Sequence, residues 1–193
     1  MQKKEYLIFL KGKTKISKGC VIGPNCIIED TIVGENSVLN NVQAYEAEVE
    51  KNVKIGPFVQ LRPNSKILEG VKIGDFVEIK NSTIGKGTAV SHLTYVGDSD
   101  VGANVNFGCG VATANYDGEN KFRTVVEDNA FIGCNTNLVA PVKVGKGAYT
   151  AAGSTITSDV PDGALAIERG KTSIKEEYAI KKLKKRIEKF EKK

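Results

Sequence analysis

The chain is poor in several residue types that mark common kinds of protein. Its 193 residues include no tryptophan, one methionine and one histidine, and only 7% of them are aromatic. It has no run of about 18 apolar residues, so we expect no membrane-spanning helix. The N-terminal segment QKKEYLIFLKG has too short an apolar core for a signal peptide, and we therefore expect a cytoplasmic protein.

Cysteine is also scarce, and its copies are scattered. Cys20, Cys26, Cys109 and Cys134 do not form a metal-ligand cluster. A chain of this size without an export signal needs no disulfide framework, so we expect reduced thiols and no metal. A zinc hydratase of the γ-carbonic anhydrase type needs three histidines, which this chain can supply only around a three-fold axis.

The formal net charge of +5 is concentrated at one end. Residues 171–193 hold ten Lys/Arg and four Glu, a balance of +6, so the remainder has 18 basic and 19 acidic residues, a balance of −1. Basic character confined to a tail does not indicate a nucleic-acid surface along the whole protein. We expect neither nucleic acid nor a membrane as partner, although a basic amphipathic tail keeps both as alternatives.

Aliphatic residues recur at a spacing of six through most of the chain, with occasional steps of five. The frame contains Ile16, Ile22, Val33, Ile55, Leu61, Ile67, Ile73, Ile79, Ile84, Val90, Val96, Val101, Phe107, Ile132, Leu138, Val144, Thr150 and Ile156. Four residues later stands a small or β-branched side chain, as in Cys20, Cys26, Ser37, Val59, Ser65, Val71, Val77, Thr83, Thr88, Thr94, Val105, Val111, Thr136, Val142, Ala148 and Ser154. Asp100 is the exception.

A period of six is not helical. In extended strands, alternate side chains share a face, so the first and fifth residues of each hexad can point into one core. Glycine often follows the aliphatic residue, as at Gly56, Gly85 and Gly145, which suggests corners with unusual dihedral angles. Three such sides make a coil of about 18 residues, and stacked coils bury what one coil cannot. The pattern predicts an all-β fold, a left-handed parallel β-helix of hexapeptide repeats.

Two segments interrupt the hexads. Residues 115–125, NYDGENKFRTV, are polar and contain the turn dipeptide Asp117-Gly118, so we expect a loop ejected from one coil. After Pro161 the hexads end, and residues 173–193 place apolar side chains at helical spacing. We expect a β-helix domain over residues 1–165 and a C-terminal arm with an amphipathic basic α-helix over residues 166–193. Ser173 and Glu176 fit a capping box, and the helix is expected to cover the end of the β-helix or a neighbouring subunit.

Because the inward positions of the hexads form the core, any catalytic or binding residues must stand at the outward positions. His92 is third in its hexad and therefore accessible, with Tyr95 expected on the same strand. Cys109 is also third in its hexad and should stack about one coil from His92. An isolated histidine is usually ordinary surface, but the polar residues Asn106 and Asn115 crowd the next coil and its loop.

Two cations add a second indication. Arg62 and Lys80 are both second in their hexads and 18 residues apart, so they should stack at strand spacing, about 5 Å. Like charges at that separation repel each other by about 1 kcal/mol or more. The arrangement is tolerable on a surface, but it also suits a clamp for a phosphate group.

Much of the sequence resembles a known family. From about Ile55 to Arg169 it is similar to the C-terminal acetyltransferase half of the bacterial bifunctional GlmU family, in the motifs GPFVQLRP, GDFVEIK, SHLTYVGDSDVGANVNFGCG, ATANYDGENKFRT, FIGCNTNLVAP and ALAIER. The resemblance implies acetyl-CoA-dependent N-acetylation of glucosamine 1-phosphate on the route to UDP-N-acetylglucosamine, a peptidoglycan precursor. It also implies a homotrimer with sites between subunits.

The resemblance assigns roles to individual positions. His92 matches the catalytic base. The sugar phosphate, or its nucleotide-sugar product, would be held by Arg62, Lys80, Tyr95 and Asn106. The acetyl-CoA site would comprise Cys109, Asn115, Tyr116, Lys121, Cys134, Ala152 and Arg169. The family usually has alanine at the position of Cys109 and serine at that of Cys134, so the fit of the pantetheine arm is in question.

The mechanism expected from these residues is direct transfer. An imidazole can accept the amine proton near neutral pH as the amine attacks the thioester. The nucleotidyltransferase domain of the family is absent from this sequence, so we expect no synthesis of a nucleotide sugar from UTP. Two alternatives remain, an acetyltransferase for another amino sugar and a non-catalytic β-helix scaffold.

Overall fold

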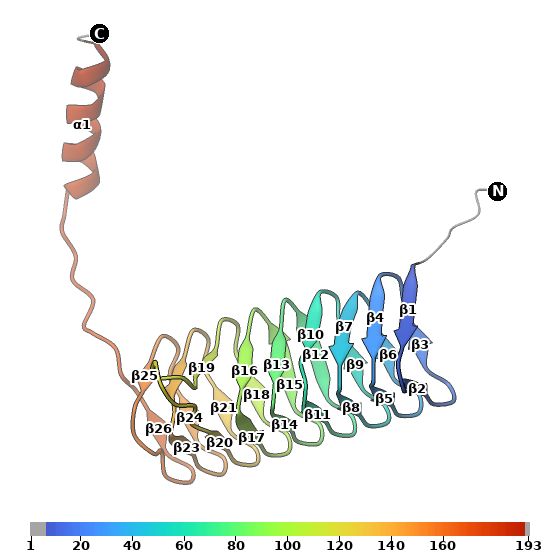
Figure 1. Ribbon diagram of the computed structural model, residues 1–193. Helices are drawn as coiled ribbons and strands as arrows, with labels where there is room; N and C mark the ends of the chain where they lie inside the picture. Colours follow the sequence, from blue (N-terminus) through green and yellow to red (C-terminus); the bar gives the residue numbers. More distant parts are fainter. Residues whose placement is uncertain (1–6, 192–193) are drawn as a thin grey trace.

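The computed structural model describes residues 7–191 and shows a three-sided parallel β-helix with one C-terminal helix (Figure 1). Strands pair in parallel with the strand three places later in the chain, except that the last strand pairs with the one two places before it, so each coil contributes one strand to each of three faces. Partner residues are 17 apart between Glu78 and Tyr95 and 25 apart between Ala112 and Asn137, where extra chain leaves the coil. The predicted stack of hexapeptide coils is confirmed.

The three faces are named A, B and C here. Face A contains β1 (Ile8–Lys11), β4 (Cys26–Glu29), β7 (Val42–Tyr45), β10 (Val59–Leu61), β13 (Glu78–Lys80), β16 (Tyr95–Gly97), β19 (Ala112–Ala114), β22 (Asn137–Val139) and β25 (Thr155–Ile156). Face B contains β2 (Lys15–Ile16), β5 (Ile32–Val33), β8 (Glu48–Val49), β11 (Lys66–Ile67), β14 (Thr83–Ile84), β17 (Ser99–Val101), β20 (Thr124–Val126) and β23 (Val142–Val144). Face C contains β3 (Val21–Ile22), β6 (Val38–Leu39), β9 (Lys54–Ile55), β12 (Lys72–Asp75), β15 (Ala89–His92), β18 (Asn106–Phe107), β21 (Phe131–Ile132), β24 (Tyr149–Thr150) and β26 (Leu165–Ala166).

The core lies along the axis of the prism and consists of the hexad aliphatics. From Val33 onward every one of them is at most 5% exposed, whereas Ile16 and Ile22 in the first coil are only partly buried. Full burial of such a side chain stabilises the fold by about 1.5–3 kcal/mol. Because each coil buries its aliphatics only against its neighbours, stacking supplies the stability that a single coil lacks.

The small inward position was predicted correctly except beside the five-residue steps. Thr83 is half-buried and Asp100 is exposed, and the inward places are taken by Ser82 and Ser99. Where one side of a coil has five residues and not six, its last inward-facing residue comes one position earlier in the sequence. The two hydroxyls are satisfied there, since Ser82 donates to the Lys80 carbonyl at 2.7 Å and Ser99 to the Gly97 carbonyl at 2.8 Å.

The expectation that the corner glycines need unusual dihedral angles was wrong for most of them. Gly85 and Gly145 do not have positive φ, although Gly56 does. At Gly85 a Cβ would lie 2.2 Å from the carbonyl oxygen of Gly102 in the next coil, so glycine is needed there for close approach. Other glycines, such as Gly19, Gly70 and Gly87, do have positive φ, and most of the non-glycine residues with positive φ are asparagines, which tolerate that conformation: Asn25, Asn36, Asn41, Asn52, Asn64, Asn81, Asn104, Asn129 and Asn135.

The two interruptions of the hexads appear as predicted, with different boundaries. The ejected loop spans residues 115–123, because Thr124 and Val125 already belong to β20. Helix α1 (Tyr178–Glu191) starts after Glu177, whose φ of 57° is incompatible with a right-handed helix, so the predicted capping box at Ser173 was wrong. Residues 192 and 193 of the predicted helical segment lie outside the described residues.

Helix α1 does not cover the end of the prism. An extended segment leads from β26 to the helix, which stands away from the coils (Figure 1). Its apolar side chains, such as Leu183 at 57% and Phe190 at 67%, are exposed. Of the two expected roles for the helix, covering the chain's own last coil is therefore wrong, and contact with a neighbouring chain stays a prediction. Across residues 7–191, no helix is long and apolar enough to cross a membrane.

Candidate active site

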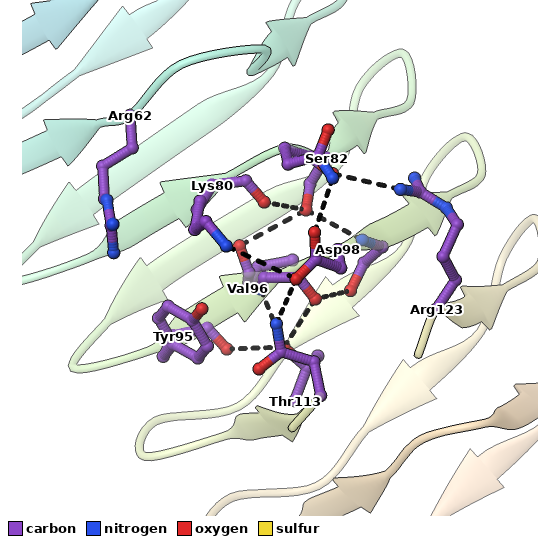
Figure 2. Close-up of polar contacts among 12 residues, drawn as sticks. Arg62, Lys80, Ser82, Tyr95, Val96, Asp98, Thr113 and Arg123 are labelled. Atoms are coloured by element: carbon purple, nitrogen blue, oxygen red, sulfur yellow. Dashed lines mark hydrogen bonds and ion pairs between the residues drawn. The ribbon is translucent and has the colours of Figure 1, made fainter. Parts of the chain in front are cut away.

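The first group of candidate residues lies where face A ends. Leu61 pairs with Ile79 and Lys80 with Gly97, which places Arg62 and Lys80 at equivalent ends of adjacent strands, as predicted. Each cation has a carboxylate partner. Arg62 Nη1 donates to Glu78 Oε1 at 2.8 Å, and this hydrogen bond raises the pKa of Arg62. Lys80 Nζ lies 3.6 Å from Asp98 Oδ2, with only 18% of its side chain exposed (Figure 2).

Asp98 is the centre of this group, and the sequence analysis did not single it out. It occupies the corner between β16 and β17, is 4% exposed, and accepts hydrogen bonds from the side-chain amides of Asn81 and Asn115. Burial alone would raise the pKa of Asp98, but the two amides and the charges of Lys80 and Lys121 outweigh burial and lower it. The carboxylate is therefore ionised at neutral pH.

The ejected loop leaves the coil beside Asp98. Asn115 is the first loop residue and is buried, whereas Tyr116 is 59% exposed and bridges to Lys121 across the loop. The neighbouring Lys80 is the main cause that lowers the pKa of Lys121, and Asp98 opposes that effect. Three cations, Arg62, Lys80 and Lys121, thus gather around two carboxylates, which leaves an excess of positive charge suited to an anion.

Tyr95 begins β16, on the other side of a corner from His92. The expectation that they share a strand was wrong, because Leu93 and Thr94 turn the chain between β15 and β16. The phenol of Tyr95 lies over Gly97, where a Cβ would come 2.2 Å from the tyrosine oxygen. Gly97 pairs with Lys80, so its missing side chain leaves room for the ring next to the cations.

The second group of candidates lies where face C ends. His92 is the last residue of β15 and is exposed. The register of β15, β18, β21 and β24 places Cys109, Cys134 and Ala152 at the same corner in the next three coils. Backbone hydrogen bonds from Asn135 to Cys109 at 2.7 Å and from Gly153 to Cys134 at 2.8 Å confirm that column. The predicted stacking of Cys109 on His92 is therefore confirmed.

Two further candidates flank the column. Arg169 Nη1 donates to the Ala152 carbonyl at 3.1 Å, which ties the C-terminal arm to its far end. Asn106 lies on β18, exposed on the outward side of face C. The four column positions span about 15 Å at strand spacing and form a shallow strip beside the only histidine.

The two groups remain apart within one chain. Strand β16, three residues long and thus about 10 Å, separates the His92 corner from the Asp98 corner. The residues predicted to bind the sugar phosphate and those predicted to bind the cofactor do not form two separate clusters. Asn115 and Lys121, predicted for the cofactor, lie beside Lys80, whereas Asn106, predicted for the sugar phosphate, is on the face of His92. Within the described part of the chain, no group of three or more His, Cys, Asp or Glu is placed to hold a metal ion.

A further contact that the sequence analysis missed anchors the return of the loop. Arg123, labelled in Figure 2, donates from Nη2 to Asp100 Oδ1 at 2.6 Å and from Nε to Oδ2 at 2.9 Å. It also donates to the Asn81 carbonyl. The sequence analysis had marked only Asp100, as the exception among the small or β-branched positions of the hexads.

Comparisons with known proteins agree with this architecture. A family model described as bacterial transferase hexapeptide (six repeats) matches residues 46–81 and 123–158. The chain is 56% identical over 169 residues to the bifunctional protein GlmU of Geobacillus sp. (strain WCH70), covering 88% of this chain and 37% of that protein. The resemblance to GlmU is confirmed. GlmU of Clostridium novyi is 55% identical over 177 residues, covering 91% of this chain and 39% of that protein.

Solved structures share the fold. The UDP-N-acetylglucosamine acyltransferase of Francisella novicida aligns with a TM-score of 0.61 at 21% identity, covering 84% of this chain and 66% of that chain. The acetyltransferase domain of PglB from Neisseria gonorrhoeae, in complex with acetyl coenzyme A, aligns with a TM-score of 0.55 at 22% identity, covering 63% of this chain and 57% of that chain. The hexapeptide repeats fit a left-handed β-helix. The chain spans less than two-fifths of the length of those GlmU relatives.

Proposed function

We propose that the protein is an acetyl-CoA-dependent N-acetyltransferase that converts glucosamine 1-phosphate to N-acetylglucosamine 1-phosphate. The observation that carries this proposal is the excess of positive charge at Arg62, Lys80 and Lys121, one short strand away from an exposed imidazole. A phosphorylated amino sugar is an acceptor that could interact with both the cations and the imidazole. Its phosphate suits the cations, and its amine needs a base.

His92 acts as the general base in this proposal. The acceptor amine attacks the thioester carbon, its proton passes to the imidazole, and the C–S bond breaks to release the thiolate of coenzyme A, which takes up the proton from the imidazolium. Direct transfer needs no covalent enzyme intermediate. Loss of a general base usually costs a factor of about 10² to 10⁴ in rate.

The acetyl-CoA site would lie along the column of Cys109, Cys134 and Ala152, with Arg169 at its end. A straight strip of small side chains beside His92 suits the extended pantetheine arm of the cofactor, which would bring the thioester to the base. Asn115, Tyr116 and Lys121 stand at the other corner. Since one chain keeps these sets apart, they would meet in one cofactor site only if a neighbouring copy supplies one of them.

We therefore propose a homotrimer in the cytoplasm with sites between subunits. Closed cyclic symmetry suits a prism with flat outward faces. The exposed Tyr116 and the extended arm after Ala166 gain contacts in such an assembly, which offsets the entropy cost of ordering them.

A thioester-cleavage assay with acetyl-CoA tests the proposal across a panel of amino sugars and their phosphates. We expect glucosamine 1-phosphate to be the preferred acceptor, with an N-acetylated product by mass spectrometry. Preference for another amino sugar would replace the acceptor, and equal use of glucosamine would overturn the phosphate assignment. No cleavage with any acceptor would favour a non-catalytic scaffold.

A further inference from the structure

Five successive coils place a residue at the same corner between faces A and B. Asp30, Glu46, Asn64, Asn81 and Asp98 all have left-handed backbones, with φ between 45° and 63°. Each of the last four donates its backbone N–H to the coil before it, as Asp98 does to the Lys80 carbonyl at 2.9 Å. Four of the five are exposed or half-buried, and Asp98 alone is buried.

A buried carboxylate is costly unless donors surround it, and Asp98 is fully surrounded. One oxygen accepts from Asn81, and the other accepts from Asn115 and faces Lys80. The donors come from three places in the chain, namely the preceding corner, the base of the loop and the end of β13. The carboxylate therefore connects a cation of the proposed phosphate site with the loop that carries Lys121.

We propose that Asp98 is a positioning residue that fixes the Lys80 ammonium and the base of the 115–123 loop without touching substrate. This inference rests on the proposed function for its kinetic consequence. A lysine tethered at 3.6 Å presents its ammonium at one place, whereas a free one samples many rotamers. Without Asp98, Lys80 and Lys121 also repel each other with no charge between them, and Asn115 loses its acceptor.

The substitution Asp98→Asn removes the negative charge and keeps the left-handed backbone conformation of the corner. Asn64 and Asn81 adopt the same left-handed corner, so Asp98→Asn is compatible with the fold. It replaces one acceptor oxygen with an NH₂ group that faces the donors of Asn115 and Lys80. The matched control is Asp30→Asn, which makes the same chemical change at the same corner with φ 47°, but in an exposed position far along the prism.

Kinetics test the contact with Lys80. Since a hydrogen bond to a charged group is worth at least about tenfold in binding, Asp98→Asn should raise KM for glucosamine 1-phosphate by about tenfold or more, with a smaller change in kcat. Asp30→Asn should leave both unchanged. In a Lys80→Ala background, Asp98→Asn should raise KM by much less than it does in the wild-type background, because the largest part of its effect passes through Lys80. Unchanged KM in Asp98→Asn, or effects that multiply in the double variant, would overturn the positioning role.

Amide hydrogen exchange tests the loop contact without any activity. Residues 115–123 should exchange faster in Asp98→Asn than in wild type or Asp30→Asn, while the β-helix strands stay protected. If Asp98→Asn melts well below Asp30→Asn, Asn115→Ala removes the donor and keeps the carboxylate, and the loop should again exchange faster. Equal loop exchange in all variants would overturn the proposal. A wild-type protein without transferase activity would instead refute the proposed function, and amide hydrogen exchange of residues 115–123 would still test the positioning role of Asp98.

Discussion

The first coils, residues 7–55, and the coils from Arg62 to Arg169 share one backbone and differ in what faces outward. Both bury aliphatics on the same hexad positions, as Ile28 and Ile79 show at 0% exposure. In the first coils the outward side chains form exposed ion pairs such as Lys11–Glu29, which contribute little. The later coils contain the buried Asp98 and an ejected loop.

The difference teaches that the inward and outward positions of a β-helix are nearly independent. Inward residues are fixed by stacking, so they repeat. Outward residues are free to vary from coil to coil, and a site can be placed on any stretch of the prism without changing its core. The following predictions test that separation, beginning with the largest expected effect.

His92→Ala should lower the rate of acetyl transfer by about 10² to 10⁴ while the melting temperature stays near wild type. The exposed imidazole contributes little to the core, so catalysis and stability should separate. The control is Gln43→Ala, an exposed outward change in the first coils, which should leave the rate unchanged. Initial rates at saturating substrates measure this, and near wild-type turnover would remove His92 from the mechanism.

Arg62→Ala or Lys80→Ala should raise KM for the phosphorylated acceptor by about tenfold or more and leave KM for acetyl-CoA nearly unchanged. Lys54 is a matched control, since it pairs in register with Lys72 and so forms another column of stacked cations, on face C. Lys54→Ala should change neither constant. A similar rise with Lys54→Ala would mean that general surface charge, and not this site, attracts the acceptor.

The loop should stay attached well into acid. Because the pKa of Asp98 is lowered, its stabilising contribution is fully present above the ordinary aspartate value of 3.8 and is lost as the pH falls through the lowered value. Hydrogen exchange of residues 115–123, corrected for intrinsic rates, should therefore be the same at pH 7 and pH 5. Faster corrected exchange at pH 5 would show that Asp98 takes up its proton at higher pH than its contacts imply.

The smallest effect is expected at the two family departures. Cys109→Ala combined with Cys134→Ser introduces the residues that the resemblance to GlmU predicts at these positions. Surface changes of this size alter free energies by about 0.5 kcal/mol or less, so KM for acetyl-CoA should shift by less than about threefold. Titration calorimetry with coenzyme A gives an independent value. A large gain in affinity would mean that the thiols obstruct the cofactor column.

The sequence predicted the core far better than the site. A period of six is a local signal, repeated often enough to identify the β-helix and to place nearly every aliphatic inward. The exceptions at Ser82 and Ser99 arose because a five-residue side moves the inward position by one. The start of α1 was missed because the left-handed Glu177 has no sequence signal.

The site depends on contacts that only the fold creates. Asn81, Asp98 and Asn115 are each 17 residues apart, and nothing local marks Asp98 as buried. The separation of His92 from Lys80 by a corner and a strand was likewise invisible until the faces were assigned. Hexad positions pointed to His92, Arg62 and Lys80, and the resemblance to GlmU assigned their roles and added the remaining candidates, whereas Asp98 came from the structure.

Mixing two inactive variants tests the central claim, that one site is built from more than one chain. His92→Ala lacks the base at the end of face C, and Tyr116→Ala lacks a proposed cofactor contact on the ejected loop, at the other corner of the chain. After subunit exchange, mixed assemblies should recover acetyl transfer to glucosamine 1-phosphate, because some interfaces then combine an intact base from one chain with an intact loop from its neighbour. Mixtures whose exchange is verified by mass spectrometry and that recover no activity would contradict a site shared between chains.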